Sequence, residues 1–136
     1  MSDYPAVLYV EDDPESCEVM HLLLVQHMGL SAVTIFQDSA DFLARVQALQ
    51  PKPDVILLDI HVQPHTGFEM LEMLRQVRGF DETPVVALTA SVMNEEVQKL
   101  RTIGFNGVVA KPIDMDTFPE ILNRVLNGKE IWRVAG

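Results

Sequence analysis

The residues of this chain that could do chemistry stand directly behind short apolar runs. Three consecutive acids, Glu11, Asp12 and Asp13, follow the first run. Later runs end in or precede a further acid, a hydroxyl residue and a lysine, which are Asp59, Thr89 and Lys111. Carboxylates crowded at the end of a buried segment repel one another, so they either point into water or surround a cation. The acids therefore raise the question of what neutralises them.

An oxygen-only cation site is the chemistry that this set of residues supports best. Two or three carboxylates, with waters and a backbone carbonyl, suit a hard divalent cation, and Mg²⁺ leaves room for a phosphoryl oxygen. With Mg²⁺ bound, an Asp carboxylate can attack a phosphorus centre, because the cation offsets the repulsion between the two anionic groups. Lys111 could pair with one phosphoryl oxygen and Thr89 could hydrogen-bond another, while the small Ala90 leaves the donor an access route.

The elements that must position these residues are predicted from hydrophobic periodicity. Five β-branched or aliphatic runs recur, each followed by a helical pattern, at 6–10, 31–36, 54–59, 84–90 and 107–110. Runs that are apolar on both faces are typical of parallel strands covered by helices on both sides. We predict an α/β fold with a (βα)5 doubly wound parallel five-stranded sheet and helices on both faces. In such sheets functional groups gather at the carboxyl ends of the strands, which places the polar residues around one pocket.

The predicted helices end at glycine or proline, which commonly stop helices. The stops are Gly29, Pro51, Gly79, Gly104 and Gly128. Asp38 or Ser39 is expected to cap the second helix, and the fourth helix is expected to open at Ser91. The sequence KEIWRVAG follows the fifth helix, so we predict one domain over residues 1–128 and a C-terminal tail over residues 129–136.

Composition excludes several classes of protein. The chain has 136 residues, 48% of them apolar, and a formal net charge of −10. This length favours a single domain, and the negative charge disfavours direct binding to nucleic acid or anionic membranes. Cys17 is the only cysteine, which excludes an internal disulfide. The N-terminus lacks a basic region and no apolar stretch is long enough to span a bilayer, so we expect a soluble cytoplasmic protein.

Some of these residues also have simpler interpretations. The acidic triplet could be a solvated loop at the start of the first helix, with Asp13 as the helix cap. Lys111, which precedes Pro112, could be a surface lysine, although a lysine that faces three acids would at least form an ion pair. His61 and His65 share one loop, but two histidines without a third spaced ligand are a weak signal for a transition metal. We therefore expect both histidines to be exposed.

The strings VEDD, LLDI, ALTA and AKPI, in this order and at these spacings, resemble the receiver domain of two-component response regulators. The resemblance extends from about Val7 to Leu126 and implies the flavodoxin-like form of the fold. It implies that Asp59 accepts a phosphoryl group from a phosphohistidine of a sensor histidine kinase or a phosphotransfer protein. The Mg²⁺ ligands that it implies are Glu11, Asp12, Asp59 and the backbone carbonyl of His61. Thr89 and Lys111 match the switch hydroxyl and the phosphate-binding lysine of the family.

The chain departs from the family pattern in two places. Relatives commonly carry a Met-Pro pair after the phosphorylated Asp and an Asp-Gly pair further on. Here the sequence reads DIHVQPHTGFEM, with Val and Gln at residues 62 and 63 and with Thr66 before the glycine. The position three residues before Lys111 is often aromatic in relatives, whereas it is Val108 here, so an aromatic switch cannot operate at this place.

Three functions are compatible with the sequence. The first is a stand-alone receiver, which passes a signal from Asp59 to a downstream protein target. Such a protein is not an enzyme, except that it catalyses its own phosphorylation and dephosphorylation. The resemblance to receiver domains implies that its surface would change at the fourth helix, the fifth strand and the fifth helix. The second is a receiver-like interaction module that does not switch, which Val108 and the altered loop would permit. The third is a flavodoxin-like cofactor binder, which is disfavoured because no glycine-rich or hydroxyl-rich phosphate loop follows the first strand.

Overall fold

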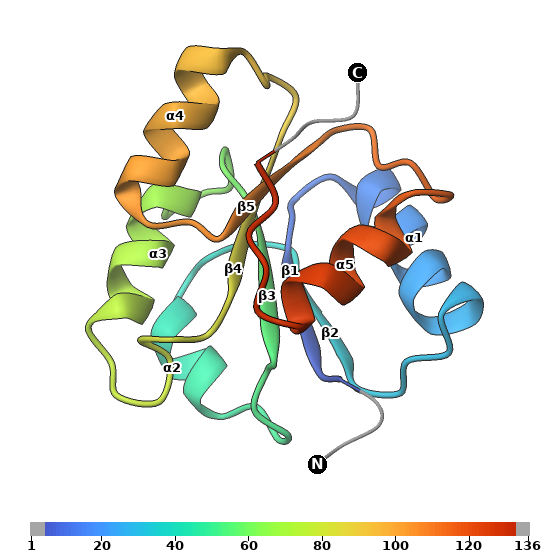
Figure 1. The fold of residues 1–136 in the computed structure, drawn as a ribbon. Coiled ribbons are helices and arrows are strands. Elements are labelled where there is room, and N and C mark those ends of the chain that lie inside the picture. The colour runs from blue at the N-terminus through green and yellow to red at the C-terminus, as the bar shows by residue number, and fades with distance from the viewer. Residues whose placement is uncertain (1–4, 133–136) are drawn as a thin grey trace.

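The computed structural model describes residues 5–132, so the last four residues of the predicted tail lie outside the described part. Five parallel strands form one sheet, in the order β2-β1-β3-β4-β5 (Figure 1). The strands are β1 Val7–Val10, β2 Val33–Phe36, β3 Val55–Asp59, β4 Val85–Thr89 and β5 Gly107–Ala110. The predicted doubly wound sheet of the flavodoxin-like class is confirmed.

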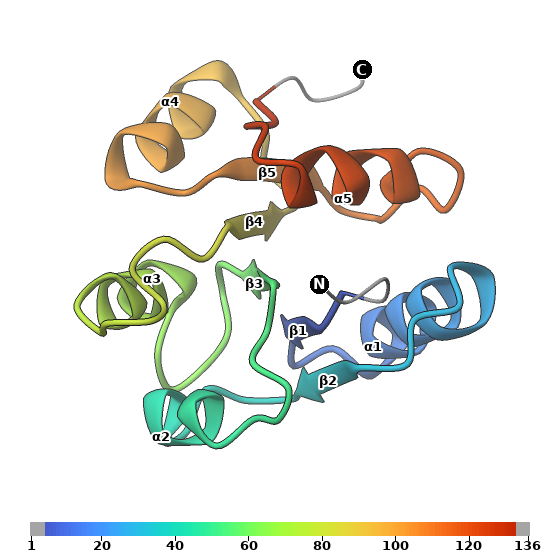
Figure 2. The same cartoon turned by 60° about the horizontal axis from the view of Figure 1, so that its bottom comes forward.

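Helices cover both faces of the sheet. They are α1 Pro14–His21, which continues into the π-helical segment η1 Leu22–His27, α2 Phe42–Gln47, α3 Gly67–Arg75, α4 Asn94–Ile103 and α5 Phe118–Leu126. Figure 2 shows α2, α3 and α4 on one side of the strands and α1 with α5 on the other. Strands β1, β3 and β4 are therefore buried at every residue, which explains their lack of polar alternation. Within residues 5–132, no helix combines the length and the apolar composition that crossing a membrane requires.

The predicted cap of the second helix is wrong. α2 follows Asp41, whose φ of 49° lies in the left-handed region, and neither Asp38 nor Ser39 occupies the cap position. The Asp38 carboxylate instead accepts hydrogen bonds from Ala40 N–H at 3.0 Å and from the Arg45 guanidinium at 2.8 Å. Short polar side chains satisfy turns as well as helix caps, and the local sequence does not separate the two uses.

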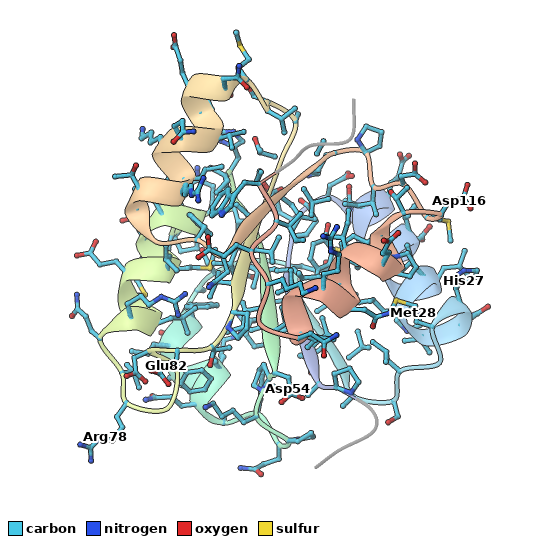
Figure 3. All side chains as sticks on the ribbon, viewed as in Figure 1. His27, Met28, Asp54, Arg78, Glu82 and Asp116 are labelled. Carbon is cyan, nitrogen blue, oxygen red and sulfur yellow. The ribbon has the colours of Figure 1, made fainter. Side chains whose placement is uncertain are left out.

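The amino ends of the strands are tied together away from the predicted polar residues. Ala6 N–H donates to Asp54 Oδ2 at 2.8 Å, and Asp54 N–H donates to the Ala6 carbonyl at 2.8 Å. Figure 3 labels Asp54 at the lower end of β3, where the strand begins. The carboxyl ends of the strands, which carry the acids and the lysine, lie at the opposite edge of the sheet.

The segment 129–132 packs along the outer side of β5. Ile131 forms a parallel β-bridge with Gly107, and Val108 N–H donates to the Ile131 carbonyl at 2.9 Å. The Ile131 side chain joins the apolar cluster under α1 and α5, whereas Trp132 packs against the cluster on the other face of the sheet. Because side chains alternate between faces in a strand, this segment has the geometry of a short additional edge strand.

Gly107 allows this close approach. A Cβ atom at this position would lie 2.9 Å from the Ile131 carbonyl oxygen, which is closer than real Cβ atoms come to a neighbour. Two further contacts hold Trp132: its Nε1 donates to the Glu130 carboxylate at 2.9 Å, and the Arg101 guanidinium of α4 lies 5.8 Å from its ring centroid. The segment therefore links β5 to α4.

We expect Gly107→Ala to detach residues 129–132 from β5 and to lower the free energy of unfolding by about 1–3 kcal/mol, because the added methyl group overpacks the contact. Trp132 is the only tryptophan, so its emission should shift to longer wavelength as it becomes solvated. Ile131→Ala should give the same shift. The control Val33→Ala, on the opposite edge strand, should lower stability without moving the emission. Unchanged emission in Gly107→Ala would contradict this account.

Candidate functional site

The register of the parallel strands brings the polar residues to one edge of the sheet. Neighbouring strands end within one residue of each other, as the pairs Val10–Leu58, Asp59–Leu88 and Thr89–Ala110 show. Asp59 and Thr89 are the last residues of β3 and β4, while Glu11 and Lys111 directly follow β1 and β5. The four side chains therefore start from neighbouring positions at the same edge of the sheet.

Three carboxylates form a cluster at this edge. The ligand oxygens of Glu11, Asp12 and Asp59 lie within 4.8 Å of one another, and no other such group of possible metal ligands occurs in the part of the chain that the structure describes. Glu11 is fully buried and Asp59 is nearly so, whereas Asp12 is exposed. Oxygen ligands at this spacing, with one side open to solvent, suit a hard divalent cation such as Mg²⁺.

The third acid of the triplet has a different role. Asp13 is the N-cap of α1, and its carboxylate accepts hydrogen bonds from the N–H and the hydroxyl of Ser16 at 3.1 and 2.7 Å. These bonds lower the pKa of the Asp13 carboxyl. The helix-capping interpretation is therefore confirmed for Asp13, and it does not apply to the neighbouring acids.

Lys111 neutralises part of the cluster. Its Nζ lies 2.6 Å from Glu11 Oε1 and 3.0 Å from Asp59 Oδ2, and its side chain is only 21% exposed. The interpretation as an ordinary surface lysine is therefore wrong, and the expected ion pair is present. One ammonium group faces three carboxylates, so an excess of negative charge remains that a divalent cation would balance.

Tyr9 is a member of the site that the sequence analysis missed. Its hydroxyl donates to Glu11 Oε1 at 3.0 Å, and its side chain is fully buried. Glu11 Oε2 accepts from Asp13 N–H at 3.2 Å, and the Glu11 carbonyl accepts from Cys17 Sγ at 3.3 Å. Side chains two residues apart in a strand share a face, so the spacing between Tyr9 and Glu11 is the signal in the sequence that could have found this contact.

The two buried carboxyls differ in their affinity for a proton. Burial, and then close contact with Asp59, raises the pKa of Glu11 from 4.5 to about 7. Burial also opposes ionisation of Asp59. Contact with Glu11 and hydrogen bonds from the His61 amide and from Lys111 together outweigh burial, so the pKa of Asp59 is lowered. Burial lowers the pKa of Lys111, but its bonds to both acids outweigh burial, so the pKa is raised above its ordinary value. Neighbouring acids titrate as a pair, and here Asp59 is the one that stays ionised.

The loop after β3 is held from both sides, despite its departure from the family pattern. Asp59 Oδ1 accepts from His61 N–H at 2.9 Å. Ser39 holds the far end of the loop, because His65 N–H donates to Ser39 Oγ at 2.6 Å and this hydroxyl donates to the His65 carbonyl at 2.7 Å. Thr66 then caps α3 in a capping box. His61 is exposed as predicted, but His65 is half-buried, so that expectation is wrong for His65.

Thr89 lies beside a small cavity next to the acidic cluster. The cavity measures about 160 Å³, and its lining includes Thr89 and His61. Thr89 Oγ1 accepts from Ser91 N–H at 3.2 Å, and the Ser91 hydroxyl donates to Glu96 of α4. Because Ser91 takes part in this turn, α4 begins at Asn94, later than predicted. The turn therefore connects Thr89 directly to α4.

The family model of the response regulator receiver domain matches residues 7–123. The chain therefore belongs to the response regulator receiver domain family, which consists of signalling modules of two-component systems. Among curated relatives, the signal transduction histidine-protein kinase BarA of Escherichia coli K12 is 30% identical over 92% of this chain but only 13% of the kinase. An uncharacterized 14.6 kDa protein of Leptolyngbya boryana is 27% identical, over 79% of each chain.

Solved structures show the same relationship. The chemotaxis response regulator CheY4 of Vibrio cholerae has a TM-score of 0.80 and 29% identity, over 90% of this chain and 98% of CheY4. The receiver domain of the sensor histidine kinase PA1611 from Pseudomonas aeruginosa has a TM-score of 0.78 and 23% identity, over 91% of this chain and 98% of that domain. The PA1611 domain holds a magnesium ion in its active site cleft, and its likeness to this chain concerns the fold alone.

The raised pKa of Glu11 predicts a dependence of stability on pH in the absence of metal. The native state holds this proton more tightly than the unfolded chain does. The contribution of Glu11 to stability is therefore full below pH 4.5 and is lost as the pH rises through about 7. Asp59 acts in the opposite sense and at lower pH, because its native pKa is lowered.

Urea unfolding in EDTA at about pH 5 and about pH 8 would measure this contribution. The wild type should lose more of its free energy of unfolding over this range than Glu11→Gln does, because glutamine has no proton to give up. The exposed control Glu120→Gln should follow the wild type. Equal losses in the wild type and in Glu11→Gln would show that Glu11 does not titrate in this range.

Proposed function

We propose that this chain is a phosphoacceptor receiver in which Asp59 takes a phosphoryl group, with the help of Mg²⁺. The observation that carries the proposal is the setting of Asp59, an ionised carboxylate that lies 3.0 Å from the Lys111 ammonium and within 4.8 Å of two further carboxylates. Membership of the receiver family supports the same role. In this proposal the chain catalyses only its own phosphorylation and dephosphorylation.

The proposed reaction is a substitution at phosphorus. An oxygen of Asp59 forms the new O–P bond while the P–N bond of a phosphohistidine breaks, and the departing imidazole nitrogen keeps the electron pair and takes up a proton. A bound Mg²⁺ would neutralise charge on the phosphoryl oxygens and on the carboxylates. The residues proposed to hold it are Glu11, Asp12, Asp59 and the backbone carbonyl of His61.

Lys111 and Thr89 would respond to the new negative charge. Lys111 now bridges Asp59 and Glu11, and a phosphoryl group on Asp59 would give its ammonium a more highly charged partner. The Thr89 hydroxyl would donate to another phosphoryl oxygen. Because Thr89 accepts the Ser91 N–H, this movement would shift the turn that leads into α4. The result is a population shift of the surface formed by α4, β5 and α5.

The chemistry also defines the partners. The relative BarA is a histidine kinase by name, which supports a phosphohistidine on a kinase or a phosphotransfer protein as the donor. The formal net charge of −10 disfavours nucleic acid and anionic membranes, so the downstream target is a protein. The proposed location is the cytoplasm, because kinases make phosphohistidine from intracellular ATP.

Incubation with acetyl phosphate and Mg²⁺ should add one phosphoryl group to the wild type, measured as intact mass. Asp59→Asn should gain none, because the amide is not a nucleophile of this kind, and omission of Mg²⁺ should remove the gain. Asp116→Asn is a matched control, since this exposed acid lies before α5 at the margin of the molecule (Figure 3), and it should react like the wild type.

A different result would favour the second function predicted from the sequence. If the wild type gains no phosphoryl group and does not bind the phosphoryl mimic beryllofluoride, the proposal is wrong. The chain would then act as a receiver-like interaction module that does not switch, and its partner should bind equally well with and without phosphodonor.

Thr89→Ala should separate phosphorylation from switching. The variant keeps the nucleophile and the acids, so it should still gain a phosphoryl group, but the missing hydroxyl should largely remove the change of hydrogen exchange over residues 94–126 that beryllofluoride causes in the wild type. Thr83→Ala removes the same kind of buried side chain just before the start of the same strand, and it should behave like the wild type. An unchanged response in Thr89→Ala would remove this hydroxyl from the switch.

A further inference from the structure

Glu11 is held by donors of very different mobility. Its Oε1 accepts from the Lys111 ammonium at 2.6 Å and from the Tyr9 hydroxyl at 3.0 Å, while its Oε2 accepts from Asp13 N–H at 3.2 Å. Lys111 sits at the end of a long flexible side chain and also serves Asp59, at 3.0 Å. The phenol and the backbone amide each serve Glu11 alone among the hydrogen bonds of the described residues.

The Tyr9 hydroxyl is a fixed donor. Tyr9 lies inside β1, level with Ile35 of β2 and Leu57 of β3, and its side chain is fully buried. The phenol hydroxyl can donate only one hydrogen bond, and here it donates it to Glu11. Neither a rotation of the side chain nor a shift of the strand is available without repacking the core.

The proposed function removes the mobile donor from Glu11. When a phosphoryl group on Asp59 attracts Lys111, Glu11 Oε1 loses its charged partner. A buried carboxylate that loses a partner is destabilised and tends to change conformation. The Tyr9 hydroxyl remains within hydrogen-bond distance of the same oxygen, and Asp13 N–H remains on the other.

We propose that Tyr9 is a positioning residue of the cation site, whose hydroxyl keeps the Glu11 carboxylate in place once Lys111 has moved to the phosphoryl group. This inference rests on the proposed function. Tyr9 touches neither the cation nor the phosphoryl group and acts through Glu11. Its importance is therefore greater in the phosphorylated form than in the unmodified form.

The test is a calorimetric titration of the full chain with Mg²⁺, in the presence and in the absence of beryllofluoride. Tyr9→Phe removes only the hydroxyl, and it should weaken Mg²⁺ binding about fivefold with beryllofluoride and less than about twofold without it, because Lys111 still holds Glu11 in the second case. Cys17→Ala is the control, since it removes a donor to the backbone carbonyl of Glu11 rather than to the carboxylate. It should bind like the wild type in both conditions.

Each other outcome of the titration overturns the proposal. Wild-type affinity in Tyr9→Phe under both conditions would show that the hydroxyl does not position Glu11, and an equal loss in both would indicate a general structural effect. These results leave the proposed function intact as long as the wild type binds Mg²⁺ and beryllofluoride. A wild type that binds neither refutes the proposed function, and the role of Tyr9 with it.

A second measurement does not depend on the folding of Tyr9→Phe. Tyr4→Phe leaves Tyr9 as the only tyrosine, so a slowly exchanging phenolic proton in its NMR spectrum belongs to Tyr9. This signal should persist after the addition of Mg²⁺ and beryllofluoride, because the hydroxyl keeps its partner. Its loss through exchange with water would show that the bond to Glu11 breaks in the phosphorylated form, contrary to the proposal.

Discussion

The ion pairs between Lys111 and the two buried acids are the interaction on which the rest of the structure depends. Burial of Glu11 and Asp59 at the end of a mostly apolar sheet destabilises the fold unless their charge is compensated. Lys111 comes from β5 and must reach past β4 to Asp59 on β3. β4 ends at Thr89, and the small Ala90 follows it. The order and the length of the strands thus bring Lys111 within reach of both acids.

In the proposed function, the same contact makes the site respond to phosphorylation. Lys111 is shared between Glu11 and Asp59, so an added charge on either acid changes the balance of its interactions. The other donors cannot follow, because the Tyr9 hydroxyl and Asp13 N–H are fixed by β1 and by the start of α1. In the proposed function, the lysine would move to the phosphoryl group while the rigid donors keep the carboxylates in place. This arrangement would let the site hold Mg²⁺ both before and after Asp59 is phosphorylated.

The outer side of β5 links this site to the surface of the molecule. Residues 129–132 occupy the edge that β5 would otherwise expose, and exposed strand edges invite pairing with other chains. Val108 stands where relatives often carry an aromatic switch residue, and its N–H is bonded to Ile131. Arg101 of α4 also contacts Trp132. A target protein that recognises α4, β5 and α5 would therefore meet this segment as well.

The sequence by itself determined the order of the elements and the chemistry of the strand ends, because both follow from local periodicity and from the residues that directly follow an apolar run. Asp59 and Lys111 were found in this way. Only the tertiary structure decided which groups pair: Lys111 reaches Glu11 across 100 residues of sequence, and Ser39 holds His65 instead of capping a helix. The contact between Tyr9 and Glu11 is the exception, because it is local and the two-residue spacing at the end of β1 could have revealed it. A contact between side chains from distant segments depends on how those segments pack, and periodicity within one segment carries no information about that packing.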